Sequence, residues 1–145
     1  MLFEPRRRAH EAYRRRLWLH PQVNDWVATR GETEEQRRFF ADTRAFLKRF
    51  VIGADFDDDS LLKPMSQGRG GVWSMRITFQ PAHRMMGGFT RPGEFVVTAY
   101  RSREQLDRES FTPTLSRAKA VWESLFVTPR LTGFSRRELL VDFVQ

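Results

Sequence analysis

The stretch Gly71-Val72-Trp73-Ser74-Met75-Arg76-Ile77-Thr78-Phe79 decides the fold class, because bulky apolar side chains occupy every second position from Trp73 onward. In an extended chain these side chains lie on one face, while Ser74 and Arg76 lie on the other. The alternation predicts a strand with one buried face. Two more strands are expected over residues 82–90 and 95–100, separated by a turn at Arg91-Pro92-Gly93-Glu94. Together the three predict an antiparallel meander over about residues 71–101.

Outside this stretch the apolar spacing is helical. Thr33 and Gln36 form a capping box, and the apolar stripe that follows predicts a helix over residues 34–51. We also expect an N-terminal helix from Pro5 to about His20-Pro21, a short helical turn over residues 103–109, and a helix capped by Thr112 that ends near residue 126. Residues 139–144 have the composition of an edge strand.

These elements predict an α+β fold in which N-terminal helices pack on one face of a small antiparallel β-sheet, followed by a C-terminal helix. A chain of 145 residues is long enough for one hydrophobic core. We therefore expect a single domain over residues 1–145, comprising a basic helical extension (1–30), a core (33–126) and a C-terminal extension (127–145).

The charge of the chain is segregated along the sequence. The formal net charge is +7, 22 of the 25 cations are Arg, and residues 61–103 contain seven cations and one anion. A GC-rich genome explains the preference for Arg, but it does not explain the clustering. Because the planar guanidinium group suits phosphate oxygens, the cluster favours nucleic acid as a partner.

Several classes of protein are excluded by composition. The chain has no cysteine, which excludes disulfides, thiolate metal sites and a Cys nucleophile and indicates a reducing compartment. It has no apolar run of the roughly 20 residues that a membrane span needs, so we expect a cytoplasmic protein without a membrane partner. The acidic run at residues 55–59 lacks the glycine and glutamate of a calcium loop, and the three histidines are far apart, so we expect no metal and no cofactor.

Strand alternation also predicts which polar side chains share a face. Arg76 and Arg84 should lie opposite the buried side, while His83 should lie on the buried side as a core histidine. On the third strand Tyr100 should join the two arginines, and Arg101, at the end of the strand, should reach either side. A β-bulge would exchange Tyr100 and Arg101.

The order of these elements and the positions of the arginines resemble the RelE/HigB-like toxin superfamily and its phage-encoded relatives. The resemblance rests on Lys63-Pro64-Met65, Gly71 to Ile77, His83-Arg84-Met85-Met86-Gly87-Gly88-Phe89, Phe95 to Thr98, and Tyr100-Arg101-Ser102-Arg103. It spans about residues 35–105. Members of this superfamily pack helices on an antiparallel sheet, and many cleave messenger RNA on the ribosome without a metal. The implied partners are RNA, the ribosome and an antitoxin protein.

The resemblance also implies roles for particular residues. Arg84 matches a phosphate-binding arginine, and Arg101 matches an arginine that stabilises the leaving group or the phosphate. Arg76 falls where many members have a lysine, and Tyr100 is the candidate to replace a late tyrosine. The catalytic candidates are thus Arg76, Arg84, Tyr100 and Arg101, and the candidates for nucleic-acid binding are Lys63, Arg69, His83, Arg91 and Arg103.

Three classes of function stay open. RNA cleavage needs a proton acceptor, and arginine, with a pKa above about 12, is a poor one, so Lys63, His83 and Tyr100 are the only candidates. The first class is a metal-independent, toxin-like endoribonuclease or ribosome-binding protein. The second is a non-catalytic nucleic-acid-binding module, and the third is a protein-interaction module such as a phage or mobile-element accessory protein.

Overall fold

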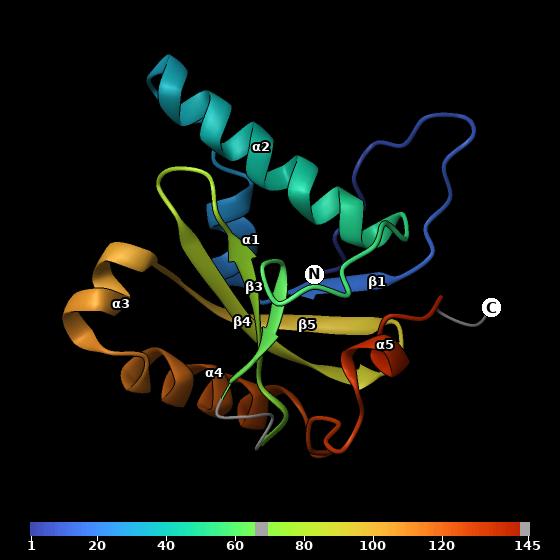
Figure 1. Cartoon of the computed structure of the whole chain (residues 1–145). Helices are drawn as coiled ribbons and strands as arrows, with labels where there is room; N and C mark the ends of the chain where they lie inside the picture. Colours follow the sequence, from blue (N-terminus) through green and yellow to red (C-terminus); the bar gives the residue numbers. More distant parts are fainter. Residues whose placement is uncertain (66–69, 143–145) are drawn as a thin grey trace.

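A five-stranded mixed β-sheet forms the centre of the protein in the computed structural model, which describes residues 1–65 and 70–142 (Figure 1). The strand order is β1-β5-β4-β3-β2. The strands are β1 (Arg16–Leu19), β2 (Leu62–Pro64), β3 (Trp73–Ile77), β4 (His83–Arg91) and β5 (Glu94–Ser102). The helices are α1 (Pro21–Val27), α2 (Glu34–Val51), α3 (Arg103–Glu109), α4 (Thr112–Leu125) and α5 (Arg136–Leu139).

The predicted antiparallel meander is present as β3, β4 and β5, but it is only part of the sheet. A short strand, β2, extends it antiparallel to β3, and β1 extends it parallel to β5 at the other side. The expectation of a small, purely antiparallel sheet is therefore wrong, while the α+β class is confirmed. Both added strands are only three or four residues long, which is too short for a clear alternation in the sequence.

The predicted N-terminal helix is absent. Residues 1–15 contain no helix, and residues 16–19 form β1, in which Leu17 is 0% and Leu19 is 1% exposed. Pro21 begins α1 instead of ending a helix, because its missing N–H is unneeded in the first helical turn. The segment expected as a basic extension thus contributes a strand to the sheet.

Helices cover both faces of the sheet, and the expectation of helices on one face only is wrong. On the first face α1 and α2 bury the large core that includes Phe46, Leu47 and Phe50 (Figure 1). On the second face α3 and α4 bury a smaller cluster, made of Val72, Met86, Ala99, Leu106 and Ala118. The second helical layer forms because the second face of the strands also carries apolar residues.

Some of the remaining helices begin and end where the sequence predicted, and others do not. The capping box of Thr33 and Gln36 begins α2 as predicted, and α3 spans the expected residues. Thr112 does not cap α4, because the N-cap position is Phe111, which makes no side-chain cap. The expected edge strand near residue 140 is also wrong within the described residues, where α5 ends at Leu139; residues 143–145 lie outside them.

A β-bulge interrupts the pairing of β4 with β5. Met86 pairs with Ala99 and Gly87 pairs with Val97, so Thr98 is an extra residue on β5. Beyond the bulge the side chains of β5 change faces. Gly87 permits this close approach, because a Cβ atom at this position would lie 1.8 Å from the carbonyl oxygen of Val96.

Candidate anion-binding site

Three arginines form a row across the second face of the sheet, the face that α3 and α4 cover. Arg76 on β3 is the cross-strand partner of Arg84 on β4, and Arg84 is in turn the partner of Arg101 on β5. Like charges directly opposite one another destabilise a sheet. Such a row needs compensating negative charge, either from the protein or from a ligand.

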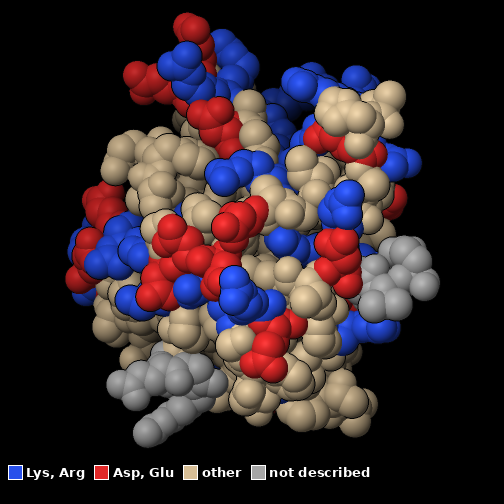
Figure 2. Space-filling model, turned by 45° about the vertical axis from the view of Figure 1, so that its right-hand side comes forward, with Lys and Arg blue, Asp and Glu red and all other residues tan. Residues whose placement is uncertain are grey.

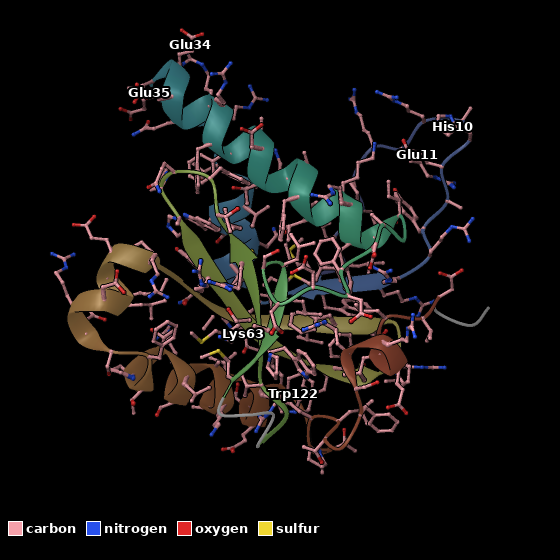
Figure 3. The ribbon with its side chains drawn as sticks, viewed as in Figure 1. His10, Glu11, Glu34, Glu35, Lys63 and Trp122 are labelled. Carbon is pink, nitrogen blue, oxygen red and sulfur yellow. The ribbon has the colours of Figure 1, made fainter. Side chains whose placement is uncertain are left out.

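Two of these arginines line a cavity of about 450 Å³ between the sheet and α3, which we call the anion cavity. Its floor is formed by Ser74 and Arg76 of β3 and Arg84 of β4, on one face of the sheet. Figure 3 labels Lys63 on β2, the strand that forms one wall. The remaining lining residues are Asp59, Pro64, Met65, Arg103 and Phe111.

Arg84 is a buried cation without an ion pair. It is 6% exposed, and its Nη1 atom donates a hydrogen bond of 3.0 Å to the carbonyl oxygen of His83. Among the residues that the structure describes, no carboxylate oxygen lies within 4.0 Å of its guanidinium nitrogens. Burial, together with the positive charges of Arg76 and Arg103 and against the opposing effect of Asp107, lowers the pKa of Arg84 to about 10.

Ser74 contributes a buried hydroxyl without a partner to the floor of the cavity. This residue is 2% exposed, and its Oγ atom has no hydrogen-bond partner within the described part of the chain. A buried hydroxyl without a partner typically costs about 1–3 kcal/mol. Ser74 and Arg84 therefore both line one cavity floor; the Ser74 hydroxyl has no acceptor, and the Arg84 guanidinium has a carbonyl acceptor but no anionic partner.

The other cations of the anion cavity are more exposed and partly engaged. Arg76 donates a hydrogen bond of 3.0 Å to the backbone oxygen of Asp59, and Arg103 forms a 3.0 Å ion pair with Asp107. Lys63 is exposed at the wall. The carboxylate of Asp59 is held by Arg136 of α5, so the lining retains an excess of positive charge.

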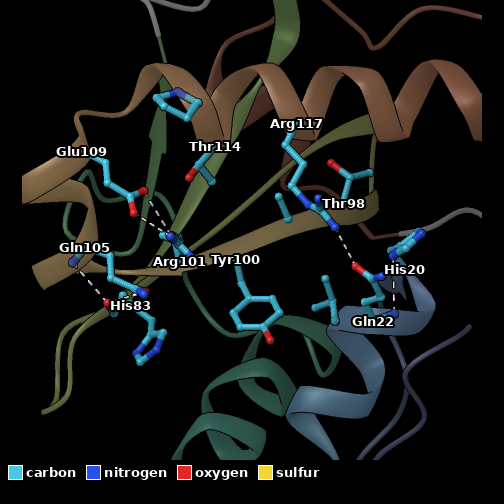
Figure 4. A pocket seen from close by; sticks show the side chains of 14 residues that line it. His20, Gln22, His83, Thr98, Tyr100, Arg101, Gln105, Glu109, Thr114 and Arg117 are labelled. Atoms are coloured by element: carbon cyan, nitrogen blue, oxygen red, sulfur yellow. Dashed lines mark hydrogen bonds and ion pairs between the residues drawn. The ribbon is translucent and has the colours of Figure 1, made fainter.

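Arg101 and Tyr100 do not line the anion cavity, contrary to the prediction. The bulge places Arg101 on the second face, where Glu109 accepts hydrogen bonds of 2.6 and 3.3 Å from its guanidinium group. Tyr100 is turned to the first face and stacks on Trp26 with a centroid distance of 4.3 Å. Figure 4 shows this separation: Arg101 points toward Glu109, whereas the Tyr100 ring points toward α1 and α2.

The view in Figure 4 is centred on a second cavity, of about 390 Å³, beside the end of β5. Arg117 of α4 donates a hydrogen bond of 2.7 Å to the side chain of Gln22 and so connects α4 with α1. The Arg101 guanidinium in this cavity is already neutralised by Glu109. The second cavity therefore lacks the unsatisfied buried cation that distinguishes the first.

The other predicted binding residues are dispersed. His83 lies on the first face, as expected, where its ring packs on Trp26 and Phe39 and burial lowers its pKa. Arg91 is seven residues from Arg84 along β4, about 23 Å at the rise of a strand. Arg69 lies outside the described residues. Of the five predicted binding residues, the anion cavity contains Lys63 and Arg103.

Five lining residues of the anion cavity were not predicted as site residues, among them Ser74 and Phe111. Ser74 could have been predicted, because it lies two residues before Arg76 on β3 and therefore on the same face of the strand. Phe111 could not, because its position depends on the corner between α3 and α4. The aromatic ring of Phe111 lies 5.4 Å from the guanidinium carbon of Arg103.

The remaining surface shows no single basic patch in the view of Figure 2, where cationic and anionic side chains are intermingled. Within residues 1–65 and 70–142, no three His, Asp or Glu side chains form a group that would hold a metal ion. No helix in the same ranges has the length and apolarity needed to cross a bilayer.

Comparison with protein-family models, curated proteins and solved structures finds no match for this chain.

Proposed function

We propose that the protein binds RNA and holds a phosphate group in the anion cavity. The observation that carries the proposal is that one cavity is lined by Arg84, a buried cation without an ion pair, and by the unpartnered hydroxyl of Ser74. Natural proteins rarely bury a charge that is not paired. A phosphate would supply acceptors for both groups and would neutralise the like-charged neighbours Arg76 and Arg84.

RNA is favoured over a small inorganic anion by the surroundings of the cavity. Further cations, Lys63 and Arg103, extend the positive charge beyond the two buried groups, as a polyanion requires. The net charge of +7 adds long-range attraction for nucleic acid. The resemblance to RelE/HigB-like toxins, in which Arg84 matches a phosphate-binding residue, agrees with this proposal.

RNA cleavage is a competing candidate function, which requires an internal phosphodiester in the anion cavity, and the position of Lys63 is the observation that favours it. Of the three candidate proton acceptors, only Lys63 lines the anion cavity, whereas His83 and Tyr100 pack on Trp26 at the first face. In this mechanism Lys63 accepts the proton of the 2′-hydroxyl, and the 2′-oxygen attacks the neighbouring phosphorus. The bond from phosphorus to the 5′-oxygen breaks, which leaves a 2′,3′-cyclic phosphate, and the departing 5′-oxygen takes the proton from Lys63. Arg76 and Arg84 stabilise the charge that develops on the phosphate. Lys63→Arg keeps the positive charge but removes the base, so it should abolish cleavage while RNA binding persists.

Binding is tested by fluorescence anisotropy with a 5′-phosphorylated single-stranded RNA at low salt. Arg84→Met should weaken binding by about tenfold or more, as expected for lost charge-assisted hydrogen bonds. Arg108→Met removes the same charge from an exposed position on α3 outside the cavity, and it should change affinity by less than about twofold. Absence of RNA affinity in the unmodified protein would contradict the proposal and favour a protein-interaction module.

A further inference from the structure

We propose that the anion cavity recognises a phosphate monoester, such as the phosphorylated end of an RNA strand, in preference to an internal phosphodiester. The inference extends the proposed function and rests on it, because it assumes that the bound nucleic acid is RNA. It rests on three properties of the cavity: its donors, its charge and its depth.

A phosphate monoester can accept more hydrogen bonds from the donors of the floor than an internal phosphodiester can. A guanidinium group has five N–H donors, and the structure gives Arg84 one acceptor, the carbonyl oxygen of His83. The free hydroxyl of Ser74 and the outer nitrogens of Arg76 add to this set. A phosphate monoester offers three non-bridging oxygens, whereas an internal diester offers two, so the monoester satisfies more of the buried donors.

The charge of the lining also matches a doubly charged group. Lys63, Arg76, Arg84 and Arg103 line the cavity, and Asp59 is the one carboxylate among the lining residues. Arg136 already pairs with Asp59, and Asp107 pairs with Arg103. Lys63, Arg76 and Arg84 form no ion pair with a described carboxylate. A monoester carries a charge of about −1.5 to −2 near neutral pH, while an internal diester carries a single charge.

The depth of the floor distinguishes a strand end from the middle of a strand. Ser74 and Arg84 are 2% and 6% exposed, and they lie between the β2 wall and the side that Arg103 and Phe111 form. An internal phosphate has a sugar on each side, and both sugars would have to enter the cavity with it. A terminal phosphate has one such substituent and can reach the floor while the strand leaves through the mouth.

The experiment compares one RNA sequence in three forms: 5′-phosphorylated, 3′-phosphorylated and without a terminal phosphate. Adenosine monophosphate serves as a fourth probe, so that a strand end and a free nucleotide can be separated. Anisotropy and calorimetric titrations are done on the full chain and on Ser74→Ala. Ser124→Ala is the matched control, because it removes an exposed hydroxyl from α4.

At least one phosphorylated form should bind about tenfold or more tightly than the unphosphorylated RNA. Ser74→Ala should reduce that advantage, whereas Ser124→Ala should leave it unchanged. Equal affinity for all three RNA forms would overturn the monoester inference while RNA binding stands. Binding of adenosine monophosphate but of no RNA would support the monoester cavity and overturn the proposed RNA-binding function.

Discussion

Two buried arginines of this protein, neither in an ion pair with a described carboxylate, have different surroundings. Arg15 is 5% exposed, donates hydrogen bonds to the backbone oxygens of Phe50 and Ala54, and packs over the Phe50 ring, while its Nε atom has no partner within the described residues. It therefore binds carbonyl oxygens at the C-terminal end of α2, where a cation interacts favourably with the helix dipole. Arg84 is buried to a similar extent but lies beside Arg76 and Arg103, which are also cations.

This contrast predicts opposite effects on stability. Arg84→Met should raise the free energy of unfolding by about 1–3 kcal/mol, because it removes a poorly compensated buried charge. Arg15→Met should lower it by about 2–4 kcal/mol, since two backbone oxygens lose their donor. Chemical denaturation at pH 7 measures both. A comparable loss of stability in the two variants would show that Arg84 has a structural role.

The burial of His83 should make the stability of the protein depend on pH. Burial lowers the pKa of His83, so the folded state binds a proton less readily than the unfolded state. The free energy of unfolding should therefore have its full value at a pH above the ordinary histidine pKa of about 6.5, and it should fall as the pH drops below that value. His83→Phe should reduce the difference in stability between pH 7.5 and pH 5, whereas His10→Phe, at an exposed position, should not. An unchanged difference in His83→Phe would contradict this assignment.

At the scale of secondary structure, the bulge between β4 and β5 decides which groups reach the anion cavity. It places Tyr100 on the first face and Arg101 beside Glu109. The bulge requires glycine at position 87, where a Cβ atom would overlap the backbone of Val96. At Gly88 a Cβ atom would instead meet mainly the flexible side chain of Arg130, at 2.7 Å.

Gly87→Ala should therefore destabilise the protein by about 3 kcal/mol or more, because the strands must separate locally. Gly88→Ala should cost less, because its Cβ atom would meet Arg130 Cγ at 2.7 Å and the Gly71 backbone oxygen at 3.0 Å, both less severe than the 1.8 Å contact at Gly87. Thermal and chemical unfolding of the two variants give the comparison. Equal losses would indicate that the register between β4 and β5 differs from the one described.

The elements that could be predicted from the sequence are those with a long periodic pattern. The helix over residues 34–51, the three strands of the meander, and the shared face of Arg76 and Arg84 follow from local spacing. Strand β1 could not be predicted, because its four residues adjoin an arginine triplet and depend on pairing with β5. A bulge that exchanges Tyr100 and Arg101 was an open alternative in the sequence, but its position at Thr98 could not be predicted, because it depends on the partner strand.

At the scale of the whole molecule, the second helical layer changes the kind of contact that the basic strands can make. We expected helices on one face of the sheet only, with the basic face left open. Helices α3 and α4 cover much of that face, so Arg76 and Arg84 line the anion cavity, whereas Arg101 lines the second cavity. This arrangement favours the insertion of a single phosphate group into the cavity over contact with an extended nucleic-acid strand.

The N-terminal arginines form a separate set. Arg14 pairs with Asp142, and Arg7 lies 4.9 Å from the centre of the Tyr13 ring. These contacts are intramolecular, and none of the arginines of residues 1–30 lines the anion cavity. A contribution from them to RNA binding would be electrostatic and would not depend on Arg84.

The most direct test is a titration of the protein with 5′-phosphorylated RNA, followed by the NMR signals of the arginine Nε–H groups. The account predicts that the Arg84 signal shifts most, with Arg76 and Arg103, while the Arg108 signal stays in place. Shifts confined to the arginines of residues 6–16, with the Arg84 signal unchanged, would contradict it.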